Sequence, residues 1–255
     1  MDWEPQEPPT DLEAETDPRR RRLLIYLLPN LFTTANLFCG YFSVVHAIRG
    51  DWYSSAMALF VAALLDGVDG RIARLTKTQS LFGEQYDSMS DLVSFGIAPA
   101  ILMHQWALVP YGRLGWIASF LYFCCAAIRL ARFNALKQFS EKKFFLGCPS
   151  PVAAGAVASA VLFYSEMGLQ AEKSVYMLII MFSLATFMIS NFRYRSFKDI
   201  NFQSQTPLSI LLFLTLVFAI VAINPNASLF PLVCIYLVSG PLLSVRKFFR
   251  KKPLA

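Results

Sequence analysis

The sequence predicts an all-α polytopic membrane protein with about eight transmembrane helices. Charged residues make up 16% of the 255 residues and hydrophobic residues 56%, whereas soluble domains average about 25% charge. Charge-free runs such as 206–222 can cross most of a hydrocarbon layer of ~30 Å. A soluble helical protein would need many helices without a polar face, so we set that alternative aside.

The predicted spans are apolar segments separated by turn signals such as Arg49-Gly50-Asp51 and Asn224-Pro225-Asn226. They lie at about 31–49, 54–76, 86–108, 114–136, 149–168, 174–191, 206–223 and 228–245.

The Lys and Arg residues predict the orientation of these spans. With alternating connections, twenty of them fall on one side, and only Arg49, Arg113 and Lys173 fall on the other. Positive residues stay inside, so we expect an inner-membrane protein with both termini in the cytoplasm. The net charge of +6 is divided among short clusters rather than gathered on one element, which argues against nucleic-acid binding.

One stretch is crowded with acidic residues. It reads DGVDGRIAR at 66–74 and continues with Gly83, Asp87 and Asp91. Asp66 and Asp69 are three residues apart and Asp87 and Asp91 four apart, so each pair shares one helix face. Ionisable groups inside spanning helices are costly and are expected to be functional. We therefore expect two helices to present four carboxylates to one point at the cytoplasmic membrane boundary.

Four converging carboxylates cannot all stay ionised and unpaired in a low dielectric. Divalent cations resolve this, and hard oxygen ligands favour Mg²⁺, Mn²⁺ or Ca²⁺ over zinc. Arg74 suits a phosphate, and Gly70 allows the backbone to approach a ligand. The alternative is an internal network of ion pairs between the Asp and Arg residues. Such a network would not require this spacing or the glycines at positions 70 and 83.

The string Asp-x-x-Asp-Gly-x-x-Ala-Arg-x8-Gly-x3-Asp-x3-Asp resembles the signature of the CDP-alcohol phosphotransferases, and every position of it is filled. The resemblance implies a six-helix catalytic membrane bundle, usually dimeric, that opens to the cytoplasm. It also implies that Asp66, Asp69 and Asp87 bind two Mg²⁺ or Mn²⁺ ions. By the same resemblance Asp91 contributes to the second ion and acts as the general base.

The resemblance also implies a nucleotide site. The segment Pro-Asn-Leu-Phe-Thr at 29–33 is similar to the family's Pro-Asn-x-x-Thr segment, and three further positions match residues that contact the CDP moiety in the family. The implied CDP-diacylglycerol contacts are Asn30, Thr33, Gly70, Arg74 and Ser80.

Three cytoplasmic stretches, 129–134, 145–151 and 193–198, resemble the phosphatidylserine synthases of this superfamily, with a similarity that covers most of 29–200. The resemblance implies transfer of a phosphatidyl group from CDP-diacylglycerol to L-serine. Cys148 replaces the leucine expected between Gly and Pro. The candidate acceptor contacts are Arg129, Arg132, Asn134, Ser150 and Arg195, with Arg132 and Arg195 as first choices for the serine carboxylate.

We therefore expect four regions: a disordered N-terminus, acidic then basic, at 1–22; the catalytic bundle at 23–200; two additional spans at 201–245; and a basic cytoplasmic tail at 246–255. The expected partners are both substrates, membrane lipids and a second copy of the chain.

Two other functions stay open. A sister enzyme using glycerol 3-phosphate or inositol phosphate would share the Asp cluster and differ only in the acceptor region. A cation or metabolite transporter would more often place its acidic residues near the bilayer midplane on broken helices, sometimes in paired halves.

Overall fold

The computed structural model describes residues 18–75, 80–137, 145–169, 174–190, 192–194, 215 and 221–250. Nearly all of them are helical. In chain order the elements are α2 (Pro18–Ile48), α3 (Trp52–Leu75), α4 (Leu81–Asp91), η1 (Leu92–Ile97), α5 (Ala98–Met103), η2 (His104–Leu108), η3 (Val109–Tyr111), α6 (Arg113–Lys137), β1 (Phe145–Leu146), α7 (Ser150–Glu166), α8 (Val175–Ile189), β2 (Arg193–Tyr194) and α10 (Pro225–Arg250).

Helices occupy the first six predicted segments and the eighth, and the segment 206–223 lies almost entirely outside the described residues. The all-helical class is confirmed for the described part of the chain, apart from the two-residue strands β1 and β2. Four of its helices are long and apolar enough to cross a membrane, and the total of eight stays a prediction. They are Pro29–Ile48, Leu81–Tyr111, Arg113–Ala135 and Pro225–Leu242.

Several observed ends differ from the predicted ones. Helix α2 begins at Pro18, so positions 19–22 form its first turns. The third segment begins at Leu81 instead of 86, because the Ser80 side chain accepts a hydrogen bond from the Gly83 N–H and caps the helix there. Helix α10 continues to Arg250, beyond the predicted end of the last span at 245.

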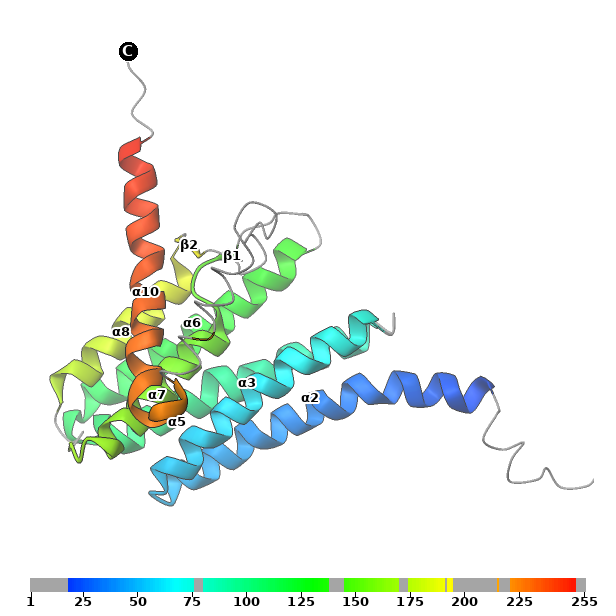
Figure 1. The fold of residues 1–255 in the computed structure, drawn as a ribbon, viewed down its shortest axis with the longest axis horizontal. Coiled ribbons are helices and arrows are strands. Elements are labelled where there is room, and N and C mark those ends of the chain that lie inside the picture. Colours follow the sequence, from blue (N-terminus) through cyan, green and yellow to red (C-terminus); the bar gives the residue numbers. More distant parts are fainter. Residues whose placement is uncertain are drawn as a thin grey trace, which may run out of the picture.

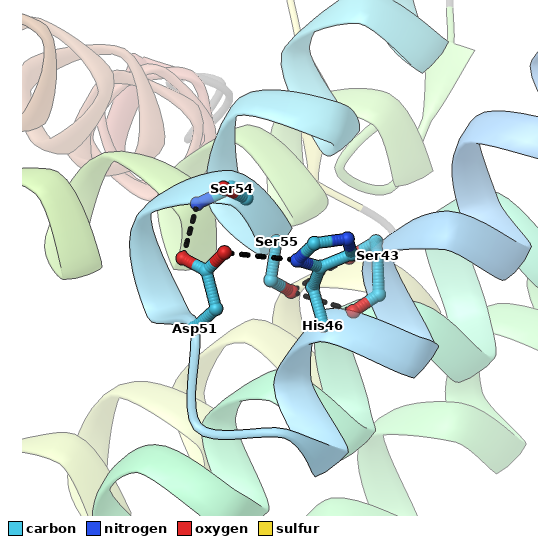
Figure 2. A network of polar contacts seen from close by, with 5 residues as sticks. All are labelled: Ser43, His46, Asp51, Ser54 and Ser55. Atoms are coloured by element: carbon cyan, nitrogen blue, oxygen red, sulfur yellow. Dashed lines mark hydrogen bonds and ion pairs between the residues drawn. The ribbon is translucent and has the colours of Figure 1, made fainter.

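Helices α2 and α3 form an antiparallel hairpin (Figure 1). Asp51 begins α3 by accepting the Ser54 N–H at 3.1 Å, and it also contacts His46 Nδ1 at 2.9 Å (Figure 2). Hydrogen bonds from Ser54, chiefly from its side chain, hold the pKa of Asp51 below its usual value. One turn further along, the Ser43 and Ser55 hydroxyls meet at 2.9 Å. These contacts set the register of the two helices.

The chain from Leu81 to Tyr111 is one interrupted helix. Two π-helical stretches, η1 and η2, flank the short α-helix α5, and η1 begins directly after Asp91. A π-helical turn changes the phase of a helix and is frequent at functional sites. Asp87 and Asp91 therefore lie on a regular α-helix, and Asp91 immediately precedes the point where the helix changes phase.

The buried core lies among α3, α5, α6, α7 and α8 and contains many small or flexible side chains, chiefly alanine and methionine. Tyr122 of α6 is fully buried and donates to the Phe95 carbonyl oxygen at 3.2 Å. Helix α10 runs across α7 (Figure 1), and Asn224 and Asn226 donate to the two carboxylate oxygens of Glu166 at 3.0 and 3.2 Å.

A small clip joins the start of α7 to the end of α8. Strands β1 and β2 pair antiparallel, with Phe145 opposite Tyr194. Gly147 adopts a φ of +84°, and a Cβ at this position would collide with the Met188 carbonyl oxygen, so only glycine fits. The Cys148 N–H donates to the Phe187 carbonyl oxygen at 2.9 Å. The clip brings two of the stretches predicted to bind the acceptor side by side.

Helix α2 and η1 approach each other most closely at Gly40. A Cβ on Gly40 would lie 2.8 Å from Ser94 Cα, which is backbone and cannot move aside. The Ser94 hydroxyl donates to the Asn36 carbonyl oxygen at 3.0 Å across the same contact. Glycine at position 40 therefore determines how closely α2 lies against the helix that carries Asp87 and Asp91.

We predict that Gly40→Ala destabilises the protein, because overpacking a close contact costs ~1–3 kcal/mol and the gain in helix propensity offsets at most about 1 kcal/mol. Thermal unfolding in detergent micelles measures the change. Gly155→Ala is the matched control, because Gly155 is also inside a helix but a Cβ there meets no atom within 4 Å. Equal stability of the two variants would contradict the close contact at Gly40.

Candidate active site

Three carboxylates from two helices converge at one end of the α2–α3 hairpin. Oxygen atoms of Asp66, Asp69 and Asp87 all lie within 4.8 Å of one another. Asp66 and Asp69 share a face of α3, and Asp87 comes from α4, as the spacing of the motif predicts. Asp69 is buried, with 4% of its surface exposed. The convergence of two acidic helix faces is confirmed for these three residues.

Asp91 joins the cluster through Asp66. The Asp91 carboxyl group interacts electrostatically with Asp66, and the charges of Asp87 and Asp69 also act on it. Four carboxyl groups therefore lie within one small volume. Asp91 is the last residue of α4, so its position is set by the helix turn that precedes the π-helical stretch η1.

The donor set fits a divalent cation. All the converging atoms are carboxylate oxygens, the ligand type that Mg²⁺, Mn²⁺ and Ca²⁺ prefer. Asp66 and Asp69 form no ion pair with any Lys, Arg or His in the described part of the chain. The alternative of an internal Asp–Arg network therefore does not apply to these two residues. Their charge has to be neutralised by protons or by bound cations.

Two side chains of helix α2 form hydrogen bonds with carboxylates of the cluster. The Thr33 hydroxyl lies 3.2 Å from Asp69 Oδ2 and 3.1 Å from the Pro29 carbonyl oxygen. One turn later, Asn36 Nδ2 donates to Asp91 Oδ1 at 3.4 Å. Sequence reasoning identified Thr33 through a motif but missed Asn36. The available signal was an amide side chain one helical turn after Thr33 in an otherwise apolar stretch.

The residues predicted to contact CDP-diacylglycerol border the same end of the bundle. Asn30 and Ser80 both face Gly83, where a Cβ would lie 3.3 Å from Asn30 Oδ1 and 3.1 Å from Ser80 Oγ. Ser80 also caps α4, a structural role that the motif did not indicate. A Cβ at Gly70 would meet no atom within 4 Å, so packing among the described residues does not require glycine there. The Arg74 Nε donates to the Gly70 carbonyl oxygen at 2.7 Å.

The predicted acceptor residues differ in their surroundings. Arg129 donates from Nη1 to the buried Ser150 hydroxyl, and its buried Nε has no hydrogen-bond partner in the described structure. Arg132 is half-buried, and its Nη1 donates to the Ile189 carbonyl oxygen at 3.4 Å in a solvent-exposed hydrogen bond. Asn134 donates to the Ser88 hydroxyl at 2.9 Å and so ties α6 to α4 beside Asp87. Arg195 lies outside the described residues.

Comparison with known proteins identifies the family. The family model described as CDP-alcohol phosphatidyltransferase matches residues 26–189. The chain belongs to this family. A Helicobacter pylori protein named CDP-diacylglycerol–serine O-phosphatidyltransferase is 35% identical over 238 residues, which cover 91% of this chain and 98% of that protein.

Two further relatives align with a smaller part of this chain. A Mycobacterium leprae protein with the same name is 34% identical over 157 residues, or 59% of this chain and 52% of that protein. An archaetidylserine synthase from Methanothermobacter thermautotrophicus is 36% identical over 171 residues, 66% of this chain and 69% of that protein. Family membership and the apolar helices together make this chain an integral membrane protein.

We predict that Asp69→Asn weakens Mn²⁺ binding by the metal-free protein by tenfold or more, because it removes one anionic ligand from a buried cluster. Binding is followed by electron paramagnetic resonance of free Mn²⁺ in detergent solution. Asp51→Asn is the matched control, because Asp51 is an exposed acid at the opposite end of the same hairpin. Unchanged affinity in Asp69→Asn would remove Asp69 from the set of metal ligands.

Proposed function

We propose that this protein transfers the phosphatidyl group of CDP-diacylglycerol to L-serine and releases CMP and phosphatidylserine. The observation that carries the proposal is the near full-length similarity to a protein named CDP-diacylglycerol–serine O-phosphatidyltransferase. The crowded carboxylates at one end of the helical hairpin supply the chemistry that such a transfer needs. The relative named archaetidylserine synthase also has serine in its name, which supports the same acceptor.

In the proposed reaction the serine hydroxyl oxygen attacks the phosphorus that carries the diacylglycerol. The bond from this phosphorus to the bridging pyrophosphate oxygen breaks, and CMP leaves with that oxygen. Asp91 accepts the proton from the serine hydroxyl during the transfer. A direct in-line displacement needs no covalent enzyme intermediate, and no Ser/His/Asp arrangement is expected from the sequence.

We assign the metal site to Asp66, Asp69, Asp87 and Asp91, with two Mg²⁺ or Mn²⁺ ions, or Ca²⁺, as the cations. When bound, such cations would screen the charge of the pyrophosphate and of the departing CMP. The protein contributes the fixed oxygen cluster and the hydrogen bond from Thr33 to Asp69. Burial of Asp69 keeps water away from one side of the cluster.

We assign the CDP moiety to the end of the bundle where α2, α3 and α4 meet. Asn30 and Ser80 both lie beside Gly83 there, and the open space beside Gly70 leaves room for a ligand. Arg74, one turn after Gly70 on α3, offers a guanidinium to a phosphate. Thr33 would act on this site through Asp69, because its hydroxyl lies against that carboxylate.

We place the serine carboxylate against Arg129, which differs from the first choices made from the sequence. Arg129 is half-buried with a fully buried Nε, and it forms no ion pair with any described residue. A guanidinium withdrawn from water without a counter-ion is costly. The charge of Asp91 acts on Arg129, which supports placing this arginine on the side of the bundle that faces the carboxylate cluster. Ser150 orients the guanidinium of Arg129, whereas the hydrogen bond that Arg132 makes is more exposed to solvent. Asn134 would support this region through Ser88.

The proposed organisation keeps the catalytic bundle at 23–200, two further spans at 201–245 and the flanking terminal segments. The family model, which matches 26–189, supports the extent of the bundle. The distribution of Lys and Arg supports a cytoplasmic location for the termini and for the active site. The proposed partners are CDP-diacylglycerol, L-serine, the surrounding lipids and a second copy of the chain.

We predict that purified protein releases CMP from CDP-diacylglycerol when L-serine is present, and much less with glycerol 3-phosphate or inositol phosphate. Release should stop in excess EDTA and return with added Mg²⁺ or Mn²⁺, because the carboxylates must be neutralised before a pyrophosphate can enter. CMP release is measured with a panel of alcohols under one set of detergent conditions. Release with a sugar or glycerol phosphate alone would leave the transfer chemistry intact and exclude serine as the acceptor.

We predict that Arg129→Lys raises the KM for serine at least about tenfold, whereas the KM for CDP-diacylglycerol changes little. Lysine keeps the charge but loses the two-pronged contact with a carboxylate, and complete loss of a buried charge pair costs ~2–5 kcal/mol. Steady-state kinetics with each substrate varied in turn separates the two constants. Arg132→Lys is the matched control, and an equal rise of the serine KM in both variants would contradict the assignment to Arg129.

A further inference from the structure

Asn36 has no role in the motifs described above, yet it is one of the most buried polar side chains among the residues that the structure describes. Its residue surface is 0% exposed, and it lies on the face of α2 that carries Thr33 one turn earlier. Its Nδ2 is 3.4 Å from Asp91 Oδ1. A carboxylate oxygen accepts hydrogen bonds and cannot donate them when ionised, so the amide nitrogen is the atom that faces Asp91.

The backbone around Asn36 is held by hydrogen bonds from the helix that carries Asp91. Ser90 donates to the Thr33 carbonyl oxygen at 3.1 Å, and Ser94 donates to the Asn36 carbonyl oxygen at 3.0 Å. Both serines are fully buried. These bonds use the main chain of α2 and leave the side chain of Asn36 to act on Asp91 alone. The close contact at Gly40 fixes the distance between the two helices.

The side chain of Asn36 contributes little to stability on its own. Its Oδ1 is buried and has no hydrogen-bond partner among the described residues, so half of the amide is unsatisfied. An unsatisfied buried acceptor destabilises a fold, and an apolar side chain of similar size would pack there without this cost. The amide is therefore better explained by what it does to Asp91 than by what it does to the fold.

We propose that Asn36 is a positioning residue that orients the Asp91 carboxylate toward the other three carboxylates by donating a hydrogen bond from Nδ2. This inference rests on the proposed function, in which Asp91 accepts the proton and contributes to the metal site. Asn36 and Thr33 then have the same role on one face of α2. Each hydrogen-bonds and so orients one carboxylate of the cluster. Partners that orient metal-binding carboxylates typically change metal affinity or activity by about 10–100-fold when removed.

The test is a double-mutant cycle between Asn36→Leu and Asp91→Asn in the full-length protein. The first readout is the affinity of the metal-free protein for Mn²⁺, and the second is kcat for CMP release. Asn36→Leu alone should weaken Mn²⁺ binding or lower kcat by about 10–100-fold. On the Asp91→Asn background, where kcat has already fallen by ~10²–10⁴, it should change both values less than about twofold.

Asn36→Asp is the second variant, because it keeps the shape of the side chain and replaces the donor by another anion. It should impair the enzyme more than Asn36→Leu when Asp91 is present, and this extra loss should shrink when residue 91 is neutral. Ser43→Ala is the control for general damage. Ser43 is fully buried on the same helix two turns further on, and its hydrogen bond goes to Ser55 instead of to the cluster. It should leave Mn²⁺ affinity and kcat unchanged.

Equal effects of Asn36→Leu on both backgrounds would overturn the proposal, as would a fall in the melting temperature of the metal-free protein larger than that of Ser43→Ala. Both results would assign Asn36 to the fold. Failure of the proposed function has a different signature, namely wild-type protein that releases no CMP with serine. The Mn²⁺ arm of the cycle does not depend on the acceptor, so it tests Asn36 in that case as well.

Discussion

The crowding of four carboxyl groups inside an apolar helical bundle is the constraint on which the rest of the structure depends. Like charges a few ångströms apart in a poorly polarisable environment repel strongly, and burial makes each ionised carboxylate more costly still. The oxygen atoms of Asp66, Asp69 and Asp87 nevertheless lie within 4.8 Å of one another. Such an arrangement persists only if the helices that carry it are held rigidly and if protons or cations compensate the charge.

The α2–α3 hairpin and the helix from Leu81 to Tyr111 supply this rigidity. Hydrogen bonds from buried serines and a close contact at Gly40 fix the helix that carries Asp87 and Asp91 against α2, and the cap at Ser80 defines where this helix begins. The network around Asp51 sets the register at the far end of the hairpin. In a lipid bilayer the hydrophobic effect does not drive apolar helices together. Hydrogen bonds between polar side chains and close backbone contacts therefore determine how these helices pack.

The other side of the proposed active site is built differently. The β1–β2 clip, Gly147 and the hydrogen bond from the Cys148 N–H to the Phe187 carbonyl oxygen bring the start of α7 against the end of α8. This places Ser150 beside Arg129, a cation without an ion-pair partner in the described structure. A site with crowded anions on one side and an uncompensated cation on the other suits a zwitterionic acceptor, because each end of such a molecule finds an opposite charge.

The sequence by itself determined the membrane class and the acidic cluster, because helix periodicity fixes which side chains share a face whatever the partners are. It predicted the first six helical segments and the eighth, and it placed Asp66, Asp69 and Asp87 together. It did not identify Asn36, and it could not distinguish the surroundings of Arg129 from those of Arg132. Those distinctions depend on which helices pack against each other and how deeply each side chain is buried. Only the tertiary structure decides them, because contacts between residues 55 positions apart leave no period in the sequence.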